Sequence, residues 1–197
     1  MNRDDRTEVA SSILEVGHNC WRREPAGRAA FLVDGAAYFD AVASAIEQAR
    51  HQVLIIGWDV HSRVHLRRDP DGSGRDALAD LLDRCVRRRP ELHVHVLAWD
   101  FAMIYAMERE TLPLLRFGLR THRRVHFHLD DRHPVGGSHH QKIVVVDDAI
   151  AFCGGLDLTA GRWDTPEHRP DDPRRRLPAG TSYGPFHDVQ AAVDGGL

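Results

Sequence analysis

Lysine is almost absent from this chain of 197 residues, because all but one of its 26 basic side chains are arginine. The exception is Lys142, and a codon bias that explains the arginines does not explain its place. The 29 acidic side chains bring the formal net charge to −3. A domain that grips nucleic acid through its phosphates usually carries a clear basic excess, so we do not expect nucleic acid to be the partner.

Long apolar runs are missing too. No stretch approaches the roughly 18 consecutive apolar residues of a membrane-spanning helix, and residues 1–20 hold no apolar core of a signal peptide. We therefore expect a cytoplasmic protein that could meet a membrane only at its periphery. Cysteine is also scarce: Cys20, Cys85 and Cys153 show no CxxC spacing for zinc or redox chemistry, and we expect them to be plain core residues.

Histidine, in contrast, is abundant, with 14 residues that often stand two apart or side by side. The pairs are His93 with His95, His126 with His128, and His139 with His140. Two-apart residues on a strand share one face and could begin a metal site, so a zinc hydrolase built on the last four is one alternative. No acidic or cysteine ligand has a matching spacing, and the sequence therefore predicts neither a metal nor another cofactor.

Hydrophobic periodicity organises the chain from about residue 31. Residues 1–30 are polar and rich in arginine, and we expect an irregular leader followed by one domain of residues 31–197. In that domain, helical spacing alternates with short apolar runs three times. The predicted helix and strand pairs are 35–50 with 51–60, 77–89 with 92–100, and 106–117, which Pro113 interrupts, with 124–129.

This alternation predicts an α/β fold, in which a mixed, largely parallel β-sheet is flanked by helices on both faces. After Gly136 the pattern changes to two strands, in residues 142–148 and 149–155, which are joined tightly. Half of the ten prolines then fall within a long surface loop, and a last strand is expected in residues 187–194.

The chemistry concentrates where His140 and Lys142 precede a run of valines. On a strand these two side chains point the same way. A neutral imidazole can attack phosphorus, and an ammonium beside it stabilises charge on the non-bridging oxygens. The pair is therefore a candidate site for phosphoryl transfer, and the alternative is a surface turn that happens to hold a histidine and a lysine.

The run HHQKIVVVDDAIAFCGGLDLTAGRWDTPEH resembles the first of the two HKD motifs of the phospholipase D superfamily. Its GG-x-DLT and GR-W-DT-x-EH segments are more similar to the phosphatidylcholine-cleaving branch than to the nucleases. The segments VLIIGWDV, HVHVLAWD and GPFHDV also fall in the family's order, so the resemblance covers most of residues 31–195. It implies one phospholipase D-like half, an α/β/α sandwich, that acts on phospholipid at a membrane interface.

The resemblance implies roles for four residues. His140 matches the histidine that attacks phosphorus and forms a phosphohistidine intermediate, and Lys142 matches the lysine that holds the phosphate oxygens. Asp147 closes the motif and is expected to order the turn and its hydrogen bonds. Asp188, in Phe-His-Asp-Val, matches the acidic residue that orients the attacking imidazole, and the alternative for it is a strand-end carboxylate.

Two more residues are expected near the substrate. Asp157 replaces an asparagine of other branches and could line the site. Trp163 and the arginine-rich loop 169–176 could contact lipid head groups, although a neutral surface loop is the simpler interpretation. His139 competes with His140 for the role of nucleophile, but neighbours on a strand point to opposite faces, so we expect it to face solvent.

The chain departs from the family because it contains a single HKD motif. In the family the second histidine is the general acid that protonates the leaving alcohol. Either a C-terminal half is missing or a homodimer partner supplies that histidine, and both alternatives stay open. The sequence thus predicts hydrolysis or transphosphatidylation of phospholipids. A homodimeric nuclease of the same superfamily and a catalytically silent half-domain are the alternatives.

Overall fold

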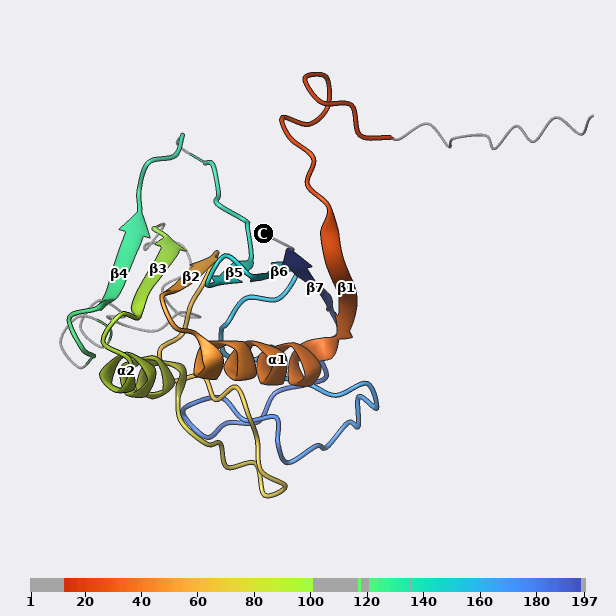
Figure 1. Ribbon diagram of the computed structural model, residues 1–197. Helices are drawn as coiled ribbons and strands as arrows, with labels where there is room; N and C mark the ends of the chain where they lie inside the picture. The colour runs from red at the N-terminus through yellow and green to blue at the C-terminus, as the bar shows by residue number, and fades with distance from the viewer. Residues whose placement is uncertain (1–12, 101–116, 118–120, 135, 196–197) are drawn as a thin grey trace, which may run out of the picture.

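The computed structural model describes residues 13–100, 117, 121–134 and 136–195. These residues form two helices and seven strands, and all seven strands belong to one sheet (Figure 1). Along the chain the elements are β1 (Ala26–Val33), α1 (Asp34–Gln48), β2 (Gln52–Gly57), α2 (Leu78–Arg88), β3 (His93–Trp99), β4 (Val125–Asp130), β5 (Ile143–Val146), β6 (Ile150–Gly154) and β7 (Val189–Gly195). Across the sheet the strands follow the order β1-β7-β6-β5-β2-β3-β4. The predicted α/β class with a mixed sheet is confirmed.

The sheet has a parallel part and an antiparallel part. Strand β2 pairs with β3, and β3 with β4, in parallel, and α2 carries the chain from β2 back to β3. The pairs β2–β5, β5–β6, β6–β7 and β7–β1 are antiparallel. The expectation of a largely parallel sheet is therefore wrong for the described strands. One of these antiparallel pairs, β5–β6, arises from the tight reversal at Asp147 and Asp148, whose φ angles of 53° and 54° fold β6 directly back along β5.

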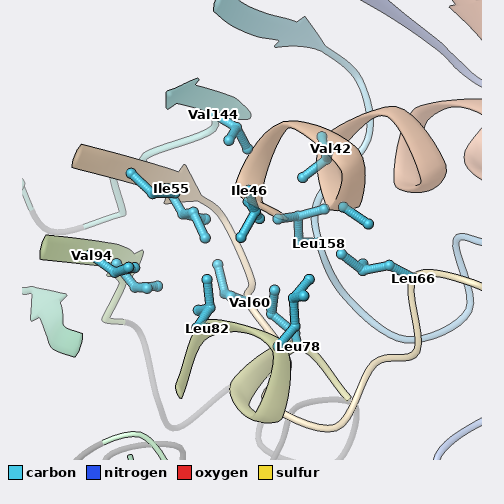
Figure 2. Close-up of a cluster of buried hydrophobic side chains, with 14 of the residues drawn as sticks. Val42, Ile46, Ile55, Val60, Leu66, Leu78, Leu82, Val94, Val144 and Leu158 are labelled. Atoms are coloured by element: carbon cyan, nitrogen blue, oxygen red, sulfur yellow. The ribbon is translucent and has the colours of Figure 1, made fainter. Parts of the chain in front are cut away.

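The core lies between the sheet and the two described helices. Figure 2 shows Val42 and Ile46 of α1 and Leu82 of α2 turned toward Ile55 and Val94 on the sheet, and all five side chains are buried. The helical spacing of the apolar residues in both helices matches this one-sided burial. Their packing explains why residues 35–50 and 77–89 fold as predicted.

Both described helices cover the same face of the sheet (Figure 1). On strand β2, Val53 and Ile55 are buried under the helices, whereas Leu54 and Ile56, which alternate with them, are only half-buried. The predicted helix 106–117 lies outside the described residues except for Phe117, whose ring stacks on Phe127 at 4.9 Å. Helices on both faces are thus not observed in the described part of the chain.

The predicted leader needs one correction. Residues 1–12 lie outside the described residues, but β1 begins at Ala26, inside the range expected to be irregular. This strand is exposed along almost its whole length, so main-chain pairing with β7, and not an apolar pattern, holds it. Among the described helices none has the length and apolarity that crossing a membrane requires.

The cysteines also differ from expectation. Cys85 of α2 is buried as predicted, but Cys153 at the end of β6 is exposed and Cys20 is half-buried. All three thiols are free. Alternation along β6 explains the exposure of Cys153, because its neighbour Phe152 takes the buried face.

Candidate active site

His140 lies in the segment that leads into β5, in the middle of the sheet, and its side chain is exposed. Its ring meets the indole of Trp58 edge to face, with 6.5 Å between ring centroids. Trp58 directly follows β2, the neighbour of β5, so the sheet order brings these two residues together. An exposed imidazole that is supported on one side by an aromatic ring is accessible to a substrate.

Lys142 stands two residues further and is buried, with 7% of its surface exposed. Its Nζ donates a hydrogen bond to the backbone oxygen of His140 at 3.1 Å. The same Nζ lies 3.3 Å from Oδ2 of Asp157. The only lysine of the chain is therefore fixed directly below the main chain of the candidate nucleophile.

The turn after β2 holds the carboxylate of Asp157. The amide of Trp58 donates to Oδ1 at 2.9 Å, and the amide of Asp59 donates to the same oxygen at 3.4 Å. A Cβ at Gly57 would lie only 2.9 Å from Oδ1, so the carboxylate occupies space that a glycine leaves open. Burial raises the pKa of Asp157 above its ordinary value, although Lys142 and the two amides oppose this shift.

This position differs from the one expected for Asp157. Its side chain is 4% exposed and faces the lysine, so in this structure it contacts the Lys142 ammonium. The expectation of a residue lining the substrate came from the resemblance, in which Asp157 replaces an asparagine of other branches. The turn formed by Gly57 and Trp58, far away in sequence, determines where the carboxylate points.

Asp147 accepts three backbone hydrogen bonds at the β5–β6 turn. The donors are the amides of Arg50, His51 and Gln52, at 2.6 to 2.8 Å. Burial raises the pKa of Asp147, but the hydrogen bonds from these amides outweigh it and hold the pKa below its ordinary value. The last residue of the motif thus joins the entry of β2 to the end of β5 and makes no contact with His140 or Lys142.

Asp188 lies just before β7, and its carboxylate does not reach His140. Its Oδ1 accepts a hydrogen bond from the amide of Val189 at 2.7 Å, and no hydrogen bond joins it to His140 among the described residues. The side chain stands over Gly155, where a Cβ would come within 2.2 Å of Oδ1. The structure therefore places Asp188 beside the loop that follows β6, in a different contact from the one that the resemblance implied.

Trp163 is a core residue, and the expectation that it contacts head groups at the surface does not fit its position. Only 5% of it is exposed, and the guanidinium of Arg174 lies over its ring at 5.0 Å. Tyr183 donates to its backbone oxygen at 2.7 Å. The loop 169–176 is fixed in the same way, because the fully buried Arg175 pairs with Asp164 at 3.0 Å.

The histidine clusters do not form the zinc site considered from the sequence. His139 is half-buried, and its Nε2 lies 3.6 Å from Asp130 Oδ2. Among the described residues, the only group whose ligand atoms lie close enough to hold a metal ion is Asp34, His168 and His187, with all atoms within 4.8 Å of one another. Asp34 is fully buried, and its Oδ2 makes no hydrogen bond with the described residues.

Sequence reasoning missed Gln190, which braces the site from β7. It is fully buried, its Oε1 accepts from the amide of Leu156 at 3.1 Å, and its Nε2 donates to the backbone oxygen of Lys142 at 3.4 Å. A single amide side chain thus links three neighbouring segments around the lysine. The signal was a glutamine within the apolar strand HDVQAAVD, since a buried polar side chain requires partners.

The family model that matches this chain and two of its sequence relatives all carry the name phospholipase D. A family model described as Phospholipase D matches residues 117–175. The chain is 33% identical over 169 residues to phospholipase D zeta 1 of Arabidopsis thaliana. This alignment covers 80% of this chain and 15% of that protein. It is 32% identical over 167 residues to human phospholipase D1, with coverages of 79% and 15%. The chain therefore spans only a small part of the length of these relatives.

Solved structures show the same fold at low sequence identity. NucT from Helicobacter pylori is 14% identical, with a TM-score of 0.53 and 85% of each chain covered. The phosphatidylserine synthase of Haemophilus influenzae Rd KW20 has the same identity and TM-score, with 88% of this chain and 35% of that chain covered. At this identity the likeness concerns the fold alone.

Proposed function

Because this chain carries a half-domain of the phospholipase D superfamily, we propose that it contributes half of the active site of a phosphodiesterase that cleaves the head group from phospholipids. The observation that carries the proposal is that the exposed His140 and the buried Lys142 lie together, with the Lys142 ammonium hydrogen-bonded to the backbone oxygen of His140. The relatives at 32% to 33% identity are named phospholipases D, and the net charge of −3 does not favour a polyanionic substrate.

In the proposed reaction, a ring nitrogen of His140 attacks the phosphorus of the phosphodiester. A nitrogen–phosphorus bond forms while the bond between phosphorus and the head-group oxygen breaks, and the lipid remains attached as a phosphohistidine. Lys142 stabilises the negative charge that grows on the non-bridging oxygens. Water or an alcohol then displaces the histidine, which gives hydrolysis or transphosphatidylation. No step calls for a metal or another cofactor.

The leaving alcohol needs a proton from a general acid. This chain contains one HKD motif, and the histidine of that motif is already the proposed nucleophile. We therefore propose that the general acid is a second histidine, supplied by a C-terminal half or by a homodimer partner. The small share of its relatives that the chain spans favours the first source. In either arrangement the protein meets its substrate at the membrane interface.

The proposed acceptor for the other ring nitrogen of His140 remains Asp188. This role requires the Asp188 carboxylate to turn away from the amide of Val189, to which it is now hydrogen-bonded. Its position over the narrow space left by Gly155 limits how far it can turn. Asp188→Asn tests the role, because loss of the negative charge beside the imidazole should lower kcat with little change in KM.

Head-group release from phosphatidylcholine vesicles tests the function. The chain alone, and the chain mixed with a C-terminal half that carries a second motif, should be compared with their His140→Ala variants. We expect release that His140→Ala abolishes and that a chelator leaves unchanged. Full activity of His140→Ala would refute the assignment of the nucleophile, and cleavage of DNA in preference to lipid would favour the nuclease alternative.

A further inference from the structure

The contacts of the only lysine point to a second role for Asp157. In this structure the Lys142 ammonium has two oxygen partners: the His140 backbone oxygen at 3.1 Å and Asp157 Oδ2 at 3.3 Å. Lys142 is 7% exposed, so little water is available to solvate its charge. A buried ammonium without a counter-ion is strongly unfavourable. Asp157 is the carboxylate that offsets this cost.

The carboxylate itself has little freedom to move. Its Oδ1 accepts hydrogen bonds from the amides of Trp58 and Asp59, and this orientation directs Oδ2 toward the Lys142 ammonium. On its other side, Gly57 leaves the space that the carboxylate fills. Gly57 ends β2, and Lys142 directly precedes β5. Because β2 and β5 pair with each other, the turn that holds Asp157 lies at a fixed position relative to Lys142.

We propose that Asp157 is a positioning residue that holds the Lys142 ammonium charged and in place beneath His140 before a substrate arrives. The inference rests on the proposed function, since it assigns Asp157 to the lysine that binds the phosphate. A carboxylate is only a hydrogen-bond acceptor, so Asp157 cannot itself donate to phosphate oxygens. Its contribution is to orient the single donor group that can.

The single lysine makes the proposal measurable without turnover. An amine-directed acylating reagent modifies the unprotonated form of a lysine, and in this chain only Lys142 carries such a side chain. The rate of modification at Lys142 can be followed by mass spectrometry of its peptide at several pH values. The same measurement on the chain in urea gives the rate for a freely exposed lysine.

Asp157→Asn keeps the shape of the side chain and removes its charge. We expect Lys142 to react about tenfold faster in this variant, because its amine is no longer held in an ion pair with a carboxylate. The matched control is Asp172→Asn, which removes a buried carboxylate paired with Arg174 at 2.6 Å in another loop. That control should leave the reactivity of Lys142 unchanged. Equal rates in Asp157→Asn and the unmodified chain would overturn the proposal.

A second measurement covers the case in which Asp157→Asn folds poorly. Lys142→Met leaves the Asp157 carboxylate buried without its counter-ion and should lower the urea midpoint of unfolding. Adding Asp157→Asn to Lys142→Met should raise the midpoint again, because the unpaired charge is then removed. A double variant whose loss of stability equals the sum of the two single losses would overturn the proposal, because the two residues would then act independently. Both experiments can succeed when vesicle hydrolysis fails, so they separate this inference from the proposed function.

Discussion

Two hydrogen bonds join Asp34 and Asp188 at the start of α1, one between the main chains and one to the Asp34 side chain. The Asp34 amide donates to the backbone oxygen of Asp188 at 2.9 Å, and the Asp188 amide donates to Asp34 Oδ1 at 3.3 Å. His187 adds a contact of 2.7 Å between its Nδ1 and the same Oδ1. This exchange fixes the beginning of β7, and with it the backbone of the residue proposed to orient His140.

The first prediction concerns Asp34 itself. Asp34→Ala should lower the free energy of unfolding by about 2–4 kcal/mol, since it removes a buried acceptor and places alanine at a φ of 66°. Asp34→Asn should cost less, because asparagine tolerates this backbone conformation and keeps an acceptor oxygen. Urea unfolding of the two variants measures the difference. Equal stability of both would show that the hydrogen bonds at Asp34 contribute little.

Replacement of the single lysine by arginine should impair catalysis and leave the fold intact. Lys142→Arg introduces a planar fork, wider than an ammonium, into the narrow space between Asp157 and the His140 main chain. We expect activity of the assembled enzyme to fall by about a hundredfold or more. Circular dichroism checks that the fold is intact, and hydrolysis of phospholipid vesicles measures the loss of activity. The exchange Arg87→Lys at an exposed position is the control for both measurements. Unchanged turnover in Lys142→Arg would make the lysine incidental.

Acid stability should depend on Asp172. Hydrogen bonds from the Arg174 guanidinium lower the pKa of this carboxyl to about 2. Because the folded pKa lies below the ordinary value, the interaction stabilises the fold above about pH 4 and is lost as the pH falls through about 2. Asp172→Asn should cost about 1–2 kcal/mol at pH 7 and should flatten the stability curve between pH 4 and 2. The neighbouring exposed exchange Asp171→Asn should leave that curve unchanged.

Trp163 should matter for stability and not for lipid binding. Trp163→Ala should lower the free energy of unfolding by about 3–5 kcal/mol, because it empties a buried site beneath Arg174. Trp163→Phe should retain most of the stability and all of the binding to phosphatidylcholine vesicles. Sedimentation with vesicles and urea unfolding distinguish the two roles. A Phe variant that is stable but no longer binds vesicles would restore the surface role expected from the sequence.

Periodicity predicted the elements that bury one apolar face. Strands β2 and β3 and helices α1 and α2 all lie where the alternation of apolar residues placed them. Strand β1 escaped prediction because its side chains are exposed and only its main chain pairs. The tight joint between β5 and β6 was expected from the sequence, and two aspartates with positive φ form it. The antiparallel pairs β2–β5, β6–β7 and β7–β1 join segments that are far apart in sequence, and apolar patterns do not specify such pairings.

At the site, local spacing predicted that His140 and Lys142 lie close together, as the hydrogen bond from Lys142 to the His140 backbone shows. The expectation that both side chains point the same way from a strand is not met, because β5 begins only at Ile143, and His140 is exposed while Lys142 is buried. The partners of the lysine could not be found from local spacing. Asp157 is directed by backbone amides after β2, and Gln190 reaches the lysine from β7, so both contacts exist only after the sheet has formed. Trp163 was misplaced for a related reason, because an aromatic residue in a polar segment gives no sign of the core that closes around it.

The order of the strands also has a consequence for folding. Strand β7 lies between β1 and β6, so the first strand of the sheet has no partner until the last one has been synthesised. On a ribosome, β2 to β6 can therefore assemble with α1 and α2 while β1 waits as an unpaired edge. Strand pairs that are so distant in sequence form slowly, and until then the unpaired backbone of β1 can form hydrogen bonds with other chains. The synthesis of β7 is therefore the step that joins β1 to the rest of the sheet.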